Sequence, residues 1–395
     1  MNFITSIAIL FISGFSASLL FKKINMPGII GYLLAGIIVG PCLLNVLDSS
    51  ILAISPDIRK IALIIILIKA GLSLDIKTLK SIGRPAIFLS FLPALFEIGG
   101  TVLLAPLFLP VTRLEAAIIG SILGAVSPAV VVPKMVDLMD ENLGTEKKIP
   151  QLILAGSSLD DVFVIILFTV FVNMESGVSV SPGLTLLKIP VSIITGIFLG
   201  YLAGIPASLL FKKFKGSTTV KAVILLSFAF LIESLEGFIG ETIPFSGLLA
   251  VMAMAVSFAE KSETTETENM KDSFGRFWIP AEILLFTLVG AAVNIEYTLK
   301  AGPKALFLIL ILLIVRSLGT LVSLTGTNLN RKERLFTVFS YLPKATVQAA
   351  IGGIPLAMGL NCGNTALSIS VLSILVTAPL GATLMDKTSH KLLKS

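Results

Sequence analysis

Two adjacent aspartates, Asp160 and Asp161, lie inside an apolar stretch, GSSLDDVFVIILFTVFV, that is long enough to cross a membrane. An ionised aspartate at the centre of a membrane helix costs about 3 kcal/mol on insertion scales, so it requires a compensating proton, cation or basic partner. Neighbouring residues project about 100° apart around a helix. We therefore expect one aspartate to face an ion-accessible cavity and the other to face a partner or the cavity edge.

Three further charges, Glu97, Arg316 and Lys344, also fall within or at the edge of apolar segments. Because a lone buried ion is far costlier than a paired one, the most economical arrangement pairs Glu97 with Arg316. Direct contact between Arg316 and Asp161 is the alternative. Lys344 is expected either to be a counter-ion that leaves when a cation binds or to cap the C-terminal end of a half-helix. The sole histidine, His390, lies near the C-terminus, so no intramembrane imidazole is expected to act as a pH switch.

Composition indicates a membrane protein. Of the 395 residues, 55% are hydrophobic and only 14% are charged, and the mean hydropathy is +0.98, whereas roughly a quarter of the residues in soluble domains are charged. The net charge of +6 comes from short basic runs between apolar segments. This pattern sets membrane orientation and is not typical of a nucleic-acid surface. We expect a polytopic helical protein in contact with membrane lipids and without a nucleic-acid partner.

The apolar segments predict an all-α polytopic membrane protein with about 13 transmembrane helices. The expected spans are residues 4–21, 26–44, 61–74, 85–109, 114–132, 152–172, 184–211, 220–235, 243–258, 279–295, 305–324, 335–358 and 366–385.

Lysine and arginine concentrate in alternate connections between these spans. The positive-inside rule therefore predicts a multi-pass protein of the cell membrane with its N-terminus outside and its C-terminus in the cytoplasm. On this topology, the acidic run 260–272 is expected to be a solvated cytoplasmic loop. Residues 386–395 are expected to form a short cytoplasmic tail, with no soluble regulatory domain in this chain.

The fifth and twelfth segments contain proline and glycine in mid-membrane, in GAVSPAVVVPKM (124–135) and SYLPKATVQAAIGGIP (340–355). We expect helix breaks at Pro128, Pro133 and Pro343. Because an odd number of spans separates the two copies, they have opposite orientations, which predicts two inverted repeats with two discontinuous crossing helices, as in secondary transporters. Broken helices expose backbone groups, so loose carbonyls, the Ser127 hydroxyl and the aspartates would supply the oxygen ligands that hard monovalent cations take.

These motifs resemble those of a known family. AGLSLD (70–75), FE (96–97), GAVSPAVVVPKM, GSSLDD (156–161) and YLPKATVQAAIGG (341–353) are similar to the NHA-type sodium/proton antiporters, within the superfamily of monovalent cation/proton antiporters. The resemblance implies a homodimer. It also implies that Asp161 is the principal ion carrier with Asp160 as its neighbour, that Glu97 and Arg316 form an ion pair, and that Lys344 borders the site.

The same resemblance implies a domain organisation. A dimerisation domain would comprise residues 1–75 and 217–296, and an ion-transport core would comprise residues 85–173 and 303–385. Residues 184–211 would form a linker helix between the repeats, and residues 386–395 the cytoplasmic tail.

Together, the residues and the resemblance predict a secondary active sodium (or lithium)/proton antiporter. It would work by alternating access, with the cation and the proton competing for Asp161 and Asp160, and without a bound cofactor. The alternatives are a potassium/proton antiporter or potassium-efflux protein of the same superfamily, and a sodium-coupled organic anion symporter. An enzyme is not expected, because two adjacent acids on one helix cannot converge on a scissile carbonyl as an intramembrane aspartyl protease requires.

Overall fold

Helices make up nearly all of the computed structural model, as the composition predicts. It describes residues 2–24, 26–74, 83–176, 182–214, 216–239, 245–293 and 295–394, and no strand occurs within these ranges. In this part of the chain, eight helices are long and apolar enough to cross a membrane, and Gly28–Val39 and Thr346–Ala357 are shorter apolar helices. The all-α, multi-pass class is confirmed. The expected number of about 13 spans stays a prediction.

The helices in chain order are α1 (Phe3–Lys23), α2 (Gly28–Val39), α3 (Ser49–Ala53), α4 (Ser55–Ser73), α6 (Arg84–Leu89), α7 (Leu92–Phe108), α8 (Arg113–Leu123), α9 (Pro128–Asp140), α10 (Ile149–Glu175), α11 (Pro182–Lys213), α12 (Thr218–Ile239), α13 (Gly247–Lys261), α14 (Thr264–Ala291), α15 (Ile295–Ser323), α16 (Arg331–Ser340), α17 (Thr346–Ile351), α18 (Ile354–Ala357) and α19 (Gly363–Leu392). Asp75, the last residue of the AGLSLD motif, and the first residues of the span expected at 243–258 lie outside the described residues.

The span expected at 85–109 is interrupted, which the sequence analysis did not predict. Phe91 leaves the helical conformation, with φ −143° and ψ −32°, and separates α6 from α7. Pro93 follows in the first turn of α7, where a missing N–H has no helical partner to lose. Polar and charged residues of α7, including Glu97, are therefore positioned by a helix that starts within the expected span.

The expected loop at 260–272 is wrong, because this acidic run is helical from Thr264 onward, in α14. Its carboxylates are compensated by lysines. Glu266 pairs with Lys221 and Glu268 with Lys271, each with an N–O distance of 2.7 Å. Pairs of opposite charge spaced three or four residues apart stabilise a helix, so the acidic composition did not prevent helix formation.

The short tail expected at residues 386–395 continues the last helix, and its cytoplasmic location stays a prediction. Helix α19 continues to Leu392, and Asp386 pairs with Lys134 of α9 at 2.9 Å. Leu393 is buried, and the carbonyl of Lys394 accepts a hydrogen bond from the Gly144 N–H at 2.7 Å. The end of the described chain is thus packed onto the connection between α9 and α10.

Contacts divide the chain into two compact units. One consists of Met1–Pro56, Ile76–Ser176 and Ile283–Ser395, and the other of Asp57–Asp75 and Gly177–Glu282. The expected division into a dimerisation domain and an ion-transport core follows a different criterion and stays a prediction.

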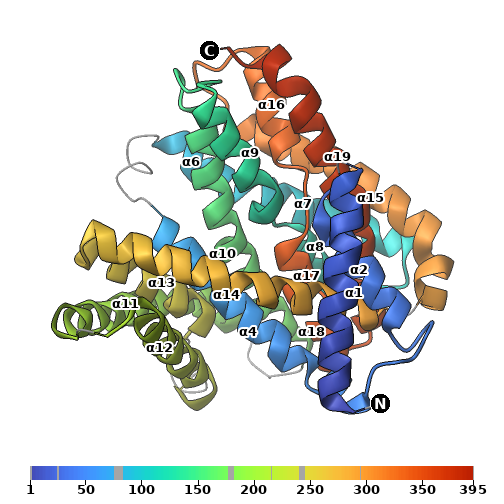
Figure 1. Ribbon diagram of the computed structural model, residues 1–395. Coiled ribbons are helices and arrows are strands. Elements are labelled where there is room, and N and C mark those ends of the chain that lie inside the picture. Colours follow the sequence, from blue (N-terminus) through green and yellow to red (C-terminus); the bar gives the residue numbers. More distant parts are fainter. Residues whose placement is uncertain are drawn as a thin grey trace. The chain divides into compact units, whose positions relative to one another are not determined.

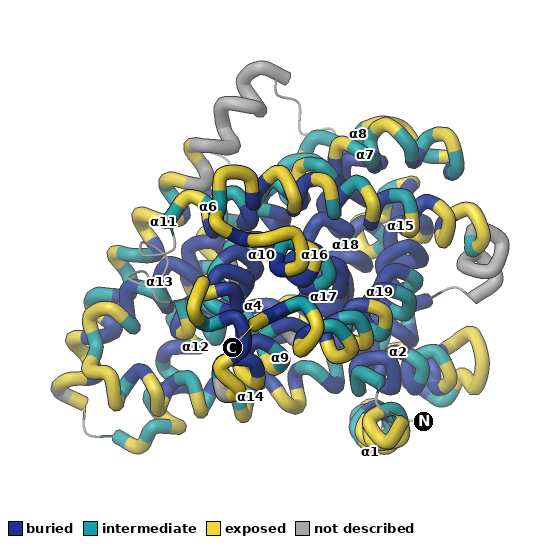
Figure 2. The backbone as a smooth tube through the Cα atoms, turned by 90° about the horizontal axis from the view of Figure 1, so that it is seen from above, coloured by how far each residue is buried: buried dark blue, intermediate teal, exposed yellow. Residues whose placement is uncertain are grey.

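The first unit contains both broken helices. Within it, α10 lies against α6, α8 and α9, while α7 packs against α8 and α15, and α19 against α15 and α16 (Figure 1). Much of α1 is exposed (Figure 2), and its exposed side carries large apolar residues such as Ile4, Ile12 and Leu20. An apolar exposed face is expected for a helix whose surroundings are hydrocarbon.

The second unit is built around α11 and α13, which pack through small residues. A Cβ added at Gly200 would collide with the backbone of Ala250, and one at Gly204 with the backbone of Met254. Glycine allows two membrane helices to approach closely and gain van der Waals contact. This interface therefore depends on the absence of side chains at these two positions.

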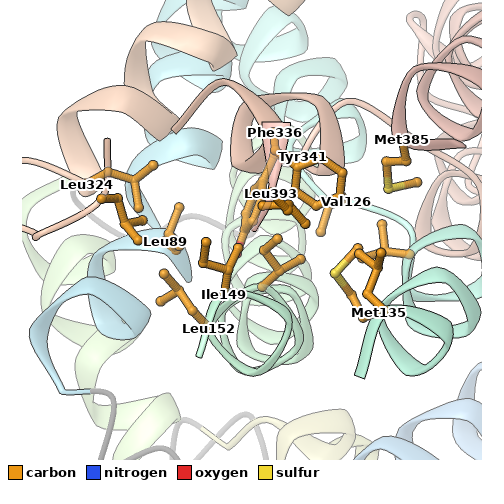
Figure 3. Packing of buried hydrophobic residues seen from close by; sticks show 14 of the residues in the cluster. Leu89, Val126, Met135, Ile149, Leu152, Leu324, Phe336, Tyr341, Met385 and Leu393 are labelled. Atoms are coloured by element: carbon orange, nitrogen blue, oxygen red, sulfur yellow. The ribbon is translucent and has the colours of Figure 1, made fainter. Parts of the chain in front are cut away.

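A buried apolar cluster in the first unit covers one side of the two breaks (Figure 3). It includes Val126 from the first break and Tyr341 from the second, together with Leu89, Ile149 and Phe336. Burial of each such side chain contributes roughly 1.5–3 kcal/mol relative to exposure. The breaks are thus held between packed helices rather than open on all sides.

Candidate functional site

The first break lies at residues 124–127, between α8 and α9. Helix α8 starts with a capping box between Thr112 and Glu115 and ends at Leu123. Pro128 occupies the first position of α9, and Ser127 precedes it with φ −90° and ψ 110°. A residue before proline is disfavoured in the α-helical conformation, and proline is well suited to a helix start. The Ser-Pro pair thus explains why the chain leaves one helix and begins another in mid-membrane.

The second break lies at residues 341–345, between α16 and α17, and contains Pro343. Ala345 has φ −161° and ψ −74° and precedes the first residue of α17. The two breaks touch, because the Ser127 N–H donates to the Pro343 carbonyl at 2.8 Å. Both main expected breaks are therefore present, and they meet.

The additional break expected at Pro133 is wrong. Helix α9 runs from Pro128 to Asp140 with Pro133 inside it. Proline removes one N–H from the helical ladder, but membrane helices tolerate this loss when neighbouring groups satisfy the freed carbonyl.

Arg316 of α15 is the centre of a fully buried charge cluster. Its Nη1 lies 2.9 Å from Glu97 Oε2, and its Nη2 lies 3.0 Å from Asp160 Oδ2. Its Nε donates to the Tyr341 carbonyl at 2.6 Å, and Nη1 also donates to the Gly124 carbonyl. The predicted pairing of Glu97 with Arg316 is confirmed as a contact, while the second carboxylate partner of Arg316 is Asp160 rather than Asp161.

Lys344 follows Pro343 and is also buried. Its Nζ lies 2.8 Å from both carboxylate oxygens of Glu97 and donates to the carbonyl of Leu123. The backbone N–H of Lys344 donates to Thr377 Oγ1 at 2.9 Å. Lys344 therefore caps the C-terminal end of a half-helix, which was one of the two expectations for this residue. The capped helix is α8, which precedes the first break.

The carbonyls at the end of α8 are occupied by side-chain donors. Leu123 and Gly124 accept from Lys344 and Arg316. Ile122 and Ala125 both accept from Gln348 Nε2, at 3.0 and 2.9 Å. Each of these four carbonyls thus accepts a donor from the other half of the unit. The expectation that loose carbonyls at this break are cation ligands stays a prediction, since a carbonyl oxygen has a second lone pair.

Several side-chain oxygens around the two breaks are buried and have no hydrogen-bond partner. They include Asp160 Oδ1, Asp161 Oδ1 and Ser127 Oγ, and also Tyr341 Oη, Thr346 Oγ1 and Gln348 Oε1. The other oxygen of Asp160, Oδ2, accepts from the Val126 N–H at 2.8 Å as well as from Arg316. Burying polar oxygens without partners costs roughly 1–3 kcal/mol each on mutational scales. These oxygens are therefore suited to bind a cation or a proton.

The charges of the cluster do not balance. Asp160, Asp161 and Glu97 bring three carboxylates, and Arg316 and Lys344 bring two cations, all of them in buried residues. With every group ionised, one negative charge is left. A single monovalent cation or a single proton would neutralise it, whereas a divalent ion would leave an excess positive charge.

Comparison with known proteins identifies the family. Residues 7–386 match the model of a family described as sodium/hydrogen exchanger, transmembrane. The chain is 33% identical over 391 residues to sodium/hydrogen exchanger 9B2 of Homo sapiens and to that of Pongo abelii, covering 93% of this chain and 70% of each relative.

The chain belongs to the sodium/hydrogen exchanger family. The resemblance found in the sequence motifs is thereby confirmed. The structure of the sodium proton antiporter MjNhaP1 from Methanocaldococcus jannaschii at pH 8 has the same fold, with a TM-score of 0.86 and coverage of 98% of both chains at 20% identity. This likeness shows that the two chains share an all-helical fold.

Two groups of this exchanger's site were not singled out in the sequence analysis: the Val126 N–H and the Gln348 side chain. A backbone N–H carries no sequence signal. Gln348 does have one, because it is a polar residue in an apolar segment, one helical turn after Lys344. In an unbroken helix this spacing would place Gln348 on the same face as the lysine, but Lys344 lies in the break, before α17 begins at Thr346.

Proposed function

We propose that this chain exchanges sodium (or lithium) for protons at one buried site formed by Asp161, Asp160 and Ser127. Membership in the sodium/hydrogen exchanger family supports the reaction. The observation that carries the assignment of the site is the single uncompensated negative charge beside the unpartnered oxygens of these residues. One cation or one proton satisfies this site, but not both at once, and such competition is the basis of antiport.

In this proposal the two adjacent acids have different roles. Asp160 is held by Arg316 and by the Val126 N–H through one oxygen and offers the other. Asp161 also has a buried oxygen without a partner and no ion pair with Arg316, and the family resemblance implies that it is the principal ion carrier. Glu97, Arg316 and Lys344 compensate one another and hold the breaks in place. Family membership favours this reaction over potassium efflux or sodium-coupled uptake of an organic anion.

The remaining parts of the proposal come from the sequence. The protein would act as a homodimer in the cell membrane, with its N-terminus outside and its C-terminus in the cytoplasm. An ion-transport core of residues 85–173 and 303–385 would move against a dimerisation domain, exposing the site to either side in turn. Basic residues concentrated in alternate connections support this orientation.

The proposal is tested in liposomes that contain the purified protein and an internal pH dye. Addition of sodium outside should drive protons out of the lumen, and lithium should do the same. Asp161→Asn, which keeps the shape and removes the charge, should abolish this exchange, and Asp137→Asn, a change at a solvent-exposed acid of α9, should not. Full exchange by Asp161→Asn would overturn the assignment of the site, and the absence of sodium-driven exchange by the wild-type protein would overturn the reaction.

A further inference from the structure

Gln348 of α17 links the two breaks through its side-chain amide. It is fully buried, and its Nε2 donates to the carbonyls of Ile122 and Ala125 at 3.0 and 2.9 Å. Helix α17 lies beside α8 (Figure 1), and the two carbonyls lie at the C-terminal end of α8 and just beyond it. Two carbonyl acceptors require the NH2 group of the amide to face them, so the orientation of the Gln348 side chain is fixed by its surroundings.

One of these carbonyls belongs to the peptide unit that contacts Asp160. The Ala125 C=O and the Val126 N–H form one planar trans peptide, so they point in opposite directions. Gln348 binds the C=O at 2.9 Å, and the N–H donates to Asp160 Oδ2 at 2.8 Å. Hydrogen bonds in such a chain polarise one another. The hydrogen bond from Gln348 to the Ala125 carbonyl thus orients the Val126 N–H and strengthens its hydrogen bond to Asp160.

We propose that Gln348 is a positioning residue that sets the competition between sodium and protons at Asp160. By holding the Ala125–Val126 peptide, it keeps a donor on Oδ2 and leaves Oδ1 as the oxygen available to an ion. It also occupies two carbonyl oxygens that would otherwise be free at the break. This inference rests on the proposed function of the same site, because it concerns how that site discriminates between its two ions.

The inference predicts a specific kinetic change in Gln348→Leu, which fills a similar volume without a donor. The carboxylate of Asp160 loses part of a hydrogen bond that favours its ionised form, so a proton competes more effectively with sodium. A whole hydrogen bond to a charged group corresponds to a change in binding of about tenfold or more, so the loss of part of one corresponds to a change of a few-fold. We therefore expect the KM for sodium to rise about threefold at acidic pH and less at alkaline pH, with a smaller change in kcat.

The test measures sodium-driven proton release over a range of pH for the wild-type protein, Gln348→Leu, Gln348→Glu and a matched control. Gln348→Glu keeps the length of the side chain but, when ionised, cannot donate to the carbonyls, so it should shift the KM in the same direction. Thr337→Val is the control, because Thr337 is fully buried in α16 and its hydroxyl donates only to the Glu333 carbonyl of its own helix. It should leave the pH dependence of KM unchanged.

Each outcome decides between the proposals. A KM that rises most at acidic pH in both Gln348 variants supports the inference. An unchanged KM, or equal losses in kcat at every pH, overturns it, since a purely structural role would lower the amount of active protein without moving the pH profile. If Gln348→Leu does not yield folded protein, Gln348→Met carries the same prediction. Failure of the wild-type protein to exchange sodium for protons would instead overturn the proposed function.

Discussion

The two breaks in the first unit differ in what they provide. The first, at 124–127, presents carbonyls and one free hydroxyl, and it contributes no charged side chain of its own. The second, at 341–345, contributes Lys344, and the helix that follows it contributes Gln348. Donors from the second half thus meet acceptors from the first half, at Leu123, Ile122 and Ala125.

The difference shows that the two breaks have different roles: the first supplies acceptors and the second supplies donors. The carbonyls at the C-terminal end of α8 have no partners within the helix, and this end carries a partial negative charge. A position near three carboxylates would therefore be unfavourable without compensation. Arg316, Lys344 and Gln348 provide that compensation. The first break is consequently stabilised by the second, and its remaining free groups, with those of Asp160 and Asp161, are left for the ion.

Removal of Arg316 should have the largest effect on stability. Arg316→Met leaves Glu97 and Asp160 without their shared partner and frees two break carbonyls, at Tyr341 and Gly124. Breaking a buried ion pair typically costs about 3–5 kcal/mol, so we expect a large drop in the thermal midpoint of the purified protein. Arg113→Met, at an exposed position, is the control. Equal midpoints for the two variants would mean that Arg316 does not hold the breaks together.

Lys344→Met should destabilise less. Glu97 would keep its contact with Arg316, while the Leu123 carbonyl would lose its cap. A hydrogen bond to a charged group contributes about 1.5–3 kcal/mol. The matched control is Lys134→Met, since Lys134 pairs with Asp386, which is 65% exposed, and such surface pairs contribute about 0–1 kcal/mol. If Lys344→Met lost as little stability as the control, the Lys344 side chain of the second break would not stabilise the first break.

These charged groups, and the pairing of Glu97 with Arg316, could be predicted from the sequence, whereas their other partners could not. Charges in apolar spans and prolines in mid-membrane are conspicuous, which is why Glu97, Arg316, Lys344, Pro128 and Pro343 were identified. The partner of each carbonyl depends on how helices far apart in the chain pack together, and a backbone donor such as the Val126 N–H has no sequence signal. The acidic start of α14 was misjudged for a related reason, because Lys221, which pairs with Glu266, lies on another helix.

Glycine substitutions at the two breaks should also differ. A Cβ at Gly381 would lie 2.6 Å from Cδ of the rigid Pro343 ring in the second break. In the first break, a Cβ at Gly124 would lie 3.2 Å from both the Gly120 carbonyl oxygen and Cγ2 of Val164, so it requires a smaller shift than the one at Gly381. Overpacking typically costs about 1–3 kcal/mol. We expect Gly381→Ala to lower the thermal midpoint more than Gly124→Ala, and the reverse order would contradict the packing described here.

Ser127→Ala should have the smallest effect on stability, because the hydroxyl of Ser127 has no hydrogen-bond partner. If that hydroxyl is a sodium ligand, the variant should bind sodium several-fold more weakly, with a loss of about 1 kcal/mol. Sodium titrations of the purified variant and of Ser121→Ala provide the comparison, since the Ser121 hydroxyl donates to a carbonyl of its own helix. Identical affinities for the two variants would remove Ser127 from the site.

The central claim is that sodium and a proton share one buried site, and sodium binding as a function of pH tests it most directly. Calorimetric titrations in buffers of different ionisation enthalpy give both the apparent Kd and the number of protons released. Once the site is mostly protonated, we expect the apparent Kd for sodium to rise about tenfold for each unit by which the pH is lowered. Sodium binding should release protons, and Asp161→Asn should show no measurable binding. A Kd that does not change with pH, or binding without proton release over the same range, would contradict a shared site.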